Sequence, residues 1–262
     1  MFKFNKIILI FILFSFCVSC NQRLPVAETL LNKNWFFKSI EDTSWFPANV
    51  PGSVHTDLLE SGIIEDPYYR LNEHELQWID KKDWLYRTTF SISQLEFDKK
   101  NSFLEFSGLD TYAKVYVNDS LLLISDNMFR SYKVDVKEYL KIGSNDLQIL
   151  FESPINKGIE KRDKLGYYPT ISANDLAEIG KVEGNKKVSI YSRKAGYHFG
   201  WDWGPRLVTS GIWRPITFQT WDNFKINDLY IQQDLQKDHV VLNTSVEIIF
   251  DEDYIGNEIF IE

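Results

Sequence analysis

The residue types best suited to chemistry gather in one short run, Tyr197-His198-Phe199-Gly200-Trp201-Asp202-Trp203-Gly204-Pro205-Arg206. At its centre two indoles flank one carboxylate, at Trp201, Asp202 and Trp203. An indole face stacks on the apolar C–H face of a pyranose, and a carboxylate accepts hydrogen bonds from two adjacent hydroxyls. The flanking glycines and Pro205 favour a shaped loop on a rigid scaffold. The pattern indicates a carbohydrate-contacting loop, with aromatic core packing as the alternative.

The other chemistry-bearing residues form no recognisable active site. The sequence contains no His-Glu-x-x-His motif and no glycine-rich phosphate loop, and its two cysteines, Cys17 and Cys20, lie together at the amino terminus, so metal and nucleotide chemistry have no support. It also lacks the Gly-x-Ser-x-Gly turn of a nucleophilic serine. The four histidines, His55, His74, His198 and His239, are scattered, and we expect them to be structural or surface residues. We therefore expect no catalytic residue, metal ligand or cofactor in this chain.

Length and charge restrict the class of protein. The chain has 262 residues, of which 44% are hydrophobic and 15% aromatic, enough for a packed core. The formal net charge is -8, and no run of Lys or Arg forms a basic stripe. Because phosphate binding needs clustered cations, nucleic acid is excluded as a partner.

The first residues resemble a bacterial export signal. Lys3 and Lys6 precede an apolar run, residues 7–18, that is too short to span a bilayer comfortably. The run ends in Cys17-Val18-Ser19-Cys20, which resembles a lipoprotein cleavage site. We expect residues 1–19 to be a signal peptide and Cys20 to carry the lipid, which places the protein in the bacterial cell envelope, membrane-anchored. An ordinary secretory signal with an incidental Cys20 is the alternative.

Alternating apolar and polar residues predict an all-β fold. The segment 84–91 alternates with a period of two, and further strands are expected at 102–106, 112–117, 121–124, 147–151, 187–191 and 215–220. Asn118-Asp119 is a hairpin turn signal. One helix is predicted at 53–61, with Ser53 as its N-cap and Gly62 after its end. Short strands separated by turns favour a jelly-roll β-sandwich.

Residues outside these strands suggest the domain boundaries. Residues 20–34 are polar and are expected to be a tether, followed by one sandwich domain over 35–222. Residues 153–187 show no strand pattern, but aromatic residues favour docking across one end of the sandwich. Three strands at 226–232, 240–250 and 258–261 are too few to close a second sandwich.

The residues after the sandwich suggest an incomplete second unit. We interpret 223–262 as the opening of an immunoglobulin-like domain, and the final strand without a capping turn predicts a truncated chain.

An ordered series of motifs resembles the amino-terminal region of β-mannosidases, in the glycoside hydrolase family that includes β-galactosidases and β-glucuronidases. The motifs extend from about Trp35 to Trp221 and include Val50-Pro51-Gly52-Ser53-Val54-His55-Thr56-Asp57-Leu58, Asp66-Pro67-Tyr68-Tyr69, Asp83-Trp84-Leu85-Tyr86-Arg87, Gly108-Leu109-Asp110-Thr111-Tyr112-Ala113, Asn127-Met128-Phe129-Arg130, His198-Phe199-Gly200-Trp201-Asp202-Trp203-Gly204-Pro205-Arg206 and Gly211-Ile212-Trp213-Arg214-Pro215. The Trp-Asp-Trp run separates β-mannosidases from their β-galactosidase relatives.

The resemblance implies a specific architecture and reaction. It implies a galactose-binding-like jelly roll, then an immunoglobulin-like domain and a catalytic (β/α)8 barrel. Trp201, Asp202 and Trp203 would contact the terminal mannose of a β-mannoside oligosaccharide. The catalysts would be two glutamates on the barrel, about 5–5.5 Å apart, that hydrolyse the bond with retention. We expect this pair and the barrel to lie beyond this chain, in the same or an adjacent polypeptide.

Two other hypotheses remain open. The chain could be a non-catalytic carbohydrate-binding lipoprotein, or an unstable gene fragment whose second domain does not fold. An in-frame barrel in the coding DNA after residue 262 would favour the enzyme over both.

Overall fold

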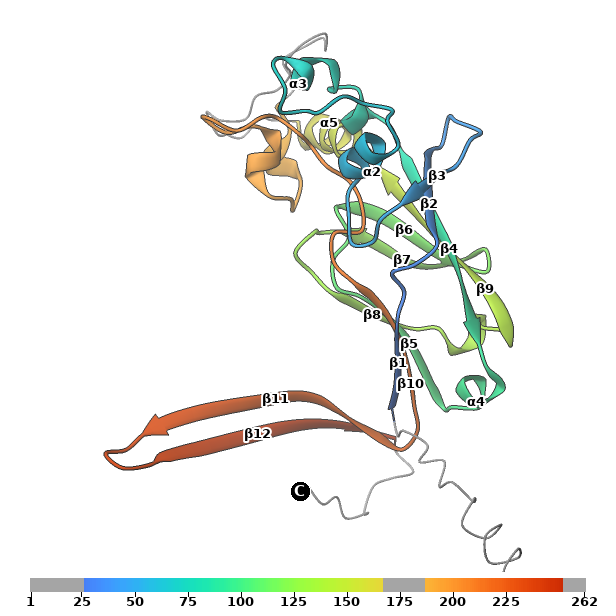
Figure 1. Ribbon diagram of the computed structural model, residues 1–262, viewed down its shortest axis with the longest axis vertical. Helices are drawn as coiled ribbons and strands as arrows, with labels where there is room; N and C mark the ends of the chain where they lie inside the picture. The colour runs from blue at the N-terminus through green and yellow to red at the C-terminus, as the bar shows by residue number, and fades with distance from the viewer. Residues whose placement is uncertain (1–25, 167–186, 252–262) are drawn as a thin grey trace, which may run out of the picture.

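The computed structural model describes residues 26–166 and 187–251 (Figure 1). The expected signal peptide, Cys20 and the expected strand at 258–261 lie outside the described residues, as do residues 167–186 of the segment without a strand pattern. Over the described part of the chain, no helix is long and apolar enough to cross a membrane.

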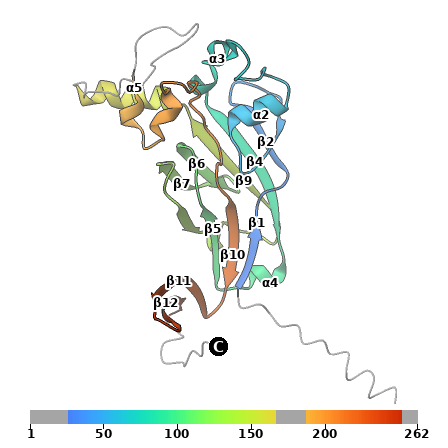
Figure 2. The ribbon, with the colours of Figure 1, turned by 60° about the vertical axis from the view of Figure 1, so that its left-hand side comes forward.

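Two antiparallel sheets form the body of the molecule, which confirms the expected all-β sandwich (Figures 1 and 2). The larger sheet has the strand order β3-β2-β4-β9-β6-β7, and its strands are β2 (Trp35–Ser39), β3 (Phe46–Ala48), β4 (Trp84–Ile92), β6 (Tyr112–Val117), β7 (Ser120–Asp126) and β9 (Gly143–Glu152). The smaller sheet has the order β1-β10-β5-β8, with β1 (Val26–Leu30), β5 (Asn101–Phe106), β8 (Tyr132–Asp135) and β10 (Ile216–Trp221).

The strands form because one face of each can be buried between the sheets. In β4 every second residue is buried, from Trp84 and Tyr86 onward, and β9 alternates in the same way. The core joins both sheets, and Phe37 and Phe151 of the larger sheet and Phe106 of the smaller one have no exposed surface. Burying side chains of this size stabilises the fold by about 1.5–3 kcal/mol each.

Local signals place the first helix and the tight turn where the sequence predicts them. Helix α2 (Val54–Glu60) begins after Ser53, whose hydroxyl accepts from the Thr56 backbone N–H, and Gly62 after its end has a φ of 67°. Asn118 and Asp119, with φ of 46° and 67°, join β6 to β7. Two consecutive positive φ values are those of a type I′ hairpin turn.

Three sequence-based expectations are wrong or incomplete. Residues 26–30 are not tether but strand β1, paired with β10 at the edge of the smaller sheet. Residues 187–191 do not form a strand, because Ser189–Tyr191 is a 3-10 helix, η3. The segment after Ser153 contains helix α5 (Pro154–Leu165), with Ser153 as N-cap and Gly166 as a left-handed C-cap.

Short helices gather at one end of the sandwich, around α2 and α5 (Figure 1). They are α3 (Asn72–Glu75), η1 (Ile79–Lys81), η3 (Ser189–Tyr191) and η4 (Gly196–Phe199), while α4 (Gln94–Phe97) and η2 (Lys137–Tyr139) join strands elsewhere. Helix α5 contacts η1 and η3. These elements position the segment that carries the Trp-Asp-Trp run.

A separate hairpin follows the sandwich and projects from its far end (Figure 1). It consists of β11 (Phe224–Leu235) and β12 (Val240–Phe250), as expected. Its base is tied to the start of β5, because the Asp222 carboxylate accepts from the Lys99 ammonium and from the Lys100 backbone N–H, both at 2.8 Å. In addition, the Asn101 side-chain amide donates to Asp251 at 3.0 Å.

Candidate functional site

The Trp-Asp-Trp run forms an exposed loop after η4. Trp203 is 84% exposed, Trp201 is 42% exposed, and Asp202 lies on the surface between them. The two indole rings meet edge to face with centroids 6.1 Å apart. The Gly204 backbone N–H donates to the Trp201 carbonyl at 3.3 Å, which closes the turn. These side chains are therefore outside the core, so the core-packing alternative does not apply to them.

A buried ion pair fixes the end of this loop. The Arg206 guanidinium is 2.6 Å from the Asp80 carboxylate, and both side chains are almost fully buried. Arg206 also donates to the side-chain oxygen of Gln77, whose own amide donates to the Arg206 carbonyl at 2.9 Å. The Arg206 backbone N–H donates to Glu73 at 2.7 Å. The α3–η1 region thus holds the loop by four separate contacts.

Apolar contacts support the start of the loop. Phe199, which is 1% exposed, packs with Ile155 of α5 and with Val188 and Val208 in a small second core. Helix α5 approaches closely because residue 158 is glycine: a Cβ there would lie 2.7 Å from the Val188 Cβ. The loop therefore rests on a helix that the strand pattern does not reveal.

A buried polar network lies beside the loop. The Lys194 ammonium donates to both oxygens of Asp110, at 2.6 and 2.5 Å, and to the Thr209 carbonyl at 2.9 Å. The Thr209 hydroxyl is 2.6 Å from Asp110 and 3.2 Å from Nδ1 of His198. Burial lowers the pKa of His198 to about 4, with the nearby Lys194 charge acting in the same direction, so its imidazole is neutral at pH 7.

His55, from α2, faces the same network. Burial lowers the pKa of His55 to about 3, and the charge of Lys194 contributes further. Its Nδ1 is buried without a hydrogen-bond partner. The cluster therefore contains one internally paired charge couple, Asp110 with Lys194, and two neutral imidazoles.

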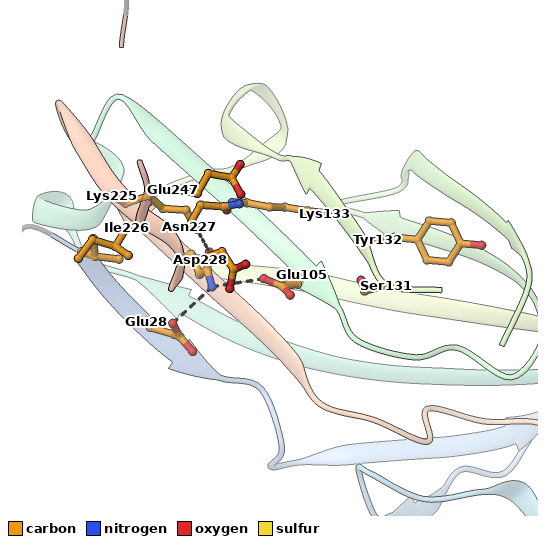
Figure 3. A pocket seen from close by; sticks show the side chains of 12 residues that line it. Glu28, Glu105, Ser131, Tyr132, Lys133, Lys225, Ile226, Asn227, Asp228 and Glu247 are labelled. Carbon is orange, nitrogen blue, oxygen red and sulfur yellow. Dashed lines mark hydrogen bonds between the residues drawn. The ribbon is translucent and has the colours of Figure 1, made fainter. Parts of the chain in front are cut away.

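A polar cavity of about 570 Å³ lies between the hairpin and the smaller sheet (Figure 3). Gln219 of β10 lines this cavity, and its side-chain amide donates to Glu28 at 3.3 Å and to Glu105 at 3.4 Å. Lys225 of β11 donates to Gln219 at 2.9 Å. Burial, followed by contact with Lys225, lowers the pKa of Lys133 to about 8. These contacts join hairpin to sandwich, and we interpret the cavity as part of that joint.

No group of three His, Cys, Asp or Glu side chains suited to a metal ion occurs within residues 26–166 and 187–251.

A two-sheet antiparallel sandwich with an exposed aromatic loop at one end is the architecture of a galactose-binding-like domain, and the family comparison gives the same class. The family model described as "Glycosyl hydrolase 2 galactose-binding domain-like" matches residues 35–214, and the chain belongs to this family of glycosyl hydrolase 2 domains. The sequence-based resemblance is confirmed at this level.

Individual relatives agree with this assignment. The chain is 37% identical over 215 residues to β-mannosidase B of Aspergillus terreus and 36% identical over 217 residues to that of Emericella nidulans. It spans about a quarter of the length of these curated relatives, with 24% of each covered, against 80% and 81% of this chain.

Solved structures give the same result. The β-D-mannosidase of Dictyoglomus thermophilum is 33% identical with a TM-score of 0.73, and the match covers 86% of this chain and 26% of that one. The exo-chitosanase CsxA of Amycolatopsis orientalis, at 18% identity and a TM-score of 0.62, shares the fold.

Sequence reasoning located the exposed loop but missed what holds it. Asp80 and Arg206 are 126 positions apart, and no local pattern connects them. His198 was expected to be a structural or surface residue, and the structure places it between the buried network and a cavity, which the sequence did not indicate. The one available signal was its position three residues before Trp201.

Proposed function

We propose that this chain is the amino-terminal part of a retaining exo-β-mannosidase that removes non-reducing terminal β-D-mannose from oligosaccharides. The observation that carries the proposal is the exposed Trp-Asp-Trp loop in a chain 37% identical to a β-mannosidase B. In this proposal Trp201 and Trp203 stack on the sugar, and Asp202 accepts hydrogen bonds from two adjacent hydroxyls. The loop forms one wall of the mannose subsite.

The proposal assigns the reaction itself to a part of the protein outside this chain. Retaining hydrolysis needs an acid/base carboxyl and a nucleophilic carboxylate about 5–5.5 Å apart. The loop supplies binding and orientation, and such interactions accelerate the reaction only where they strengthen in the transition state. The rigid attachment of Arg206 to Asp80 supports this role, because a loop held in place loses little entropy on binding.

The hairpin supports the proposed second domain, 223–262. Alternation and strand pairing put an almost wholly apolar set of side chains on one face, and several are large and exposed: Ile226, Leu229, Ile231, Leu235, Val240, Leu242 and Phe250. A two-stranded hairpin is marginal by itself and needs further strands to cover such a face. We propose that this hairpin opens an immunoglobulin-like sandwich.

Envelope localisation is a further part of the proposal. It rests on the charged start, the apolar run and Cys20 in the sequence. Labelling cells with a radioactive fatty acid tests it: the wild-type protein should be labelled and Cys20→Ser should not. Equal labelling of both would remove the anchor from the proposal.

The activity is tested on the product of the whole reading frame that contains this chain. It should release mannose from β-1,4-mannobiose with the β-anomer formed first, and should leave the matching β-galactoside and β-glucuronide intact. Failure to hydrolyse any β-mannoside, or an α-anomeric first product, would refute the proposal.

A further inference from the structure

A second cavity opens beside the Trp-Asp-Trp loop, on the same end of the sandwich. It has a volume of about 340 Å³, within the usual range for small-molecule sites. Four separate segments converge on it: the loop before α2, the start of β6, the β7–β8 connection and residues 197–213. Its lining residues include Phe129, Tyr197, His198, Thr209 and Trp213.

The walls of this cavity are aromatic. The Phe129 and Tyr197 side chains are 59% and 62% exposed, although both are large. Trp213 is half-buried, and its indole N–H donates to the Met128 carbonyl at 2.9 Å, which fixes the ring. Aromatic side chains on the walls of a concave site provide flat apolar faces to a ring-shaped ligand.

The hydrogen-bond network determines the chemistry of the floor. A carboxylate only accepts, so the Thr209 hydroxyl donates its proton to Asp110. Thr209 must then accept from His198, which requires the proton of this neutral imidazole to be on Nδ1. The Nε2 atom of His198 is therefore an unprotonated acceptor, and no described residue donates to it.

The charges at the floor exclude an ionic ligand. Lys194 and Asp110 neutralise one another, and every Asp110 oxygen already accepts hydrogen bonds from neighbouring side chains. The nearby imidazoles of His55 and His198 are neutral. The residues that line the cavity include no Lys or Arg, so a phosphate or carboxylate would find no cation among them, whereas an uncharged hydroxyl would find an acceptor.

The floor is also pre-formed. Asp110 and Gly211 exchange both backbone hydrogen bonds, at 2.9 and 3.0 Å, and the Gly52 N–H donates to the Ile212 carbonyl at 2.8 Å. Gly211 has a φ of 148°, and a Cβ there would lie 2.9 Å from the Gly52 carbonyl oxygen. Because the backbone is already ordered, a ligand would not have to organise it.

We infer that this cavity binds a neutral saccharide ring, which stacks on Phe129 and Tyr197 and donates one hydroxyl to Nε2 of His198. Since His198 is three residues before Trp201, the ring would be a neighbouring unit of the oligosaccharide held by the loop. That last step depends on the proposed function, whereas binding in the cavity does not.

The test is a titration of the whole 262-residue chain with β-1,4-mannobiose, followed by NMR of the Trp213 indole N–H. We expect saturable shifts with a dissociation constant of about 1–10 mM, and a loss of affinity of about tenfold or more in Phe129→Ala. Phe129 is exposed, so this variant should remain folded. His198→Phe, without an acceptor, should weaken binding more than His198→Gln, which keeps one.

A matched control tests whether binding depends on the cavity or on any exposed aromatic side chain. Tyr68→Ala removes an exposed aromatic side chain that does not line the cavity and should bind as wild type. No shift at about 50 mM mannobiose, equal binding by Phe129→Ala, or equal binding of cyclohexanol would overturn the inference. Shifts in the 262-residue chain, together with no β-mannoside hydrolysis by the product of the whole reading frame, would refute the proposed function alone.

Discussion

The Arg206 Nη1 atom lies 2.6 Å from the Asp80 Oδ2 atom, inside a protein in which both side chains are at most 3% exposed. This pair connects the end of the Trp-Asp-Trp loop to the η1 turn, 126 residues earlier in the chain. An exposed loop with a buried ionic attachment can present its indoles in one position. The Arg206–Asp80 pair therefore bears on both the stability of the protein and the proposed sugar binding by the loop, and each can be measured.

Arg206→Met should destabilise the protein strongly. The substitution removes the Arg206 guanidinium from the buried Asp80 carboxylate, and removing one partner of a buried pair costs about 3–5 kcal/mol. Urea unfolding should show that loss in the free energy of unfolding. Lys164→Met, which breaks an exposed pair with Glu160, is the control and should unfold as wild type. Equal stability of Arg206→Met and wild type would show that the pair does not hold the loop.

Gly158→Ala should destabilise the protein although alanine is the better helix former. An added Cβ would lie 2.7 Å from the Val188 Cβ, and overpacking of this kind costs about 1–3 kcal/mol. Propensity alone would instead stabilise α5 by about 1 kcal/mol. The sign of the change in melting temperature decides which of the two effects is larger. An increase would contradict the close packing of α5 against Val188 in the small second core.

Protonation of the buried Asp57 carboxyl should increase the free energy of unfolding as the pH falls. Burial raises the pKa of Asp57 from 3.8 to about 6, despite hydrogen bonds from the Asn49 N–H and the Tyr86 hydroxyl. The stability from this group is fully present below pH 3.8 and is lost as pH rises through about 6. Between these two pH ranges the contribution of Asp57 to the free energy of unfolding changes by about 3 kcal/mol.

The measurement is the pH dependence of unfolding in wild type and Asp57→Asn. His55 and His198 act in the opposite direction, because their lowered pKa values reduce stability as pH falls below 6.5. Both proteins contain the two histidines, so the difference between their free energies of unfolding from pH 4 to pH 6 reports the contribution of Asp57 alone. Parallel curves would show that the folded and unfolded pKa values of Asp57 are the same.

Leu242→Lys tests whether the hairpin is part of a larger sheet structure. In the 262-residue chain Leu242 is 59% exposed, so the free energy of unfolding should change by less than about 0.5 kcal/mol. In the product of the whole reading frame, where we expect the apolar face to be covered, the same change should destabilise by about 2 kcal/mol or more. No effect in the longer protein would contradict the proposed second sandwich.

Sequence patterns predicted those elements whose burial alternates strongly. Strand β4 buries every second residue, and its period of two was visible without a structure. Strand β1 was missed because it lies at a sheet edge with three exposed residues, so backbone pairing with β10 rather than side-chain burial defines it. The strand expected at 187–191 failed for another reason: Val188 is buried but Ile190 is 41% exposed, and these residues pair with none of the strands in the described part of the chain.

The candidate site was predictable only at its surface. Two indoles around a carboxylate identified the exposed loop, because their chemistry is local. The network of Asp110, Lys194 and Thr209 joins residues up to 99 positions apart, and its partners become visible only when the sandwich closes. The tautomer of His198 depends on that network, so no sequence pattern could have indicated its acceptor.

Asp202 is the residue that we propose holds the terminal mannose. The most direct measurement is kcat/KM for a β-mannoside with the whole reading-frame product, as wild type and as Asp202→Ala. Asp202 is exposed and the substitution should not affect folding, yet loss of charge-assisted hydrogen bonds to two hydroxyls should lower kcat/KM by about 100-fold or more. A value within about twofold of wild type, with the protein folded, would contradict the account.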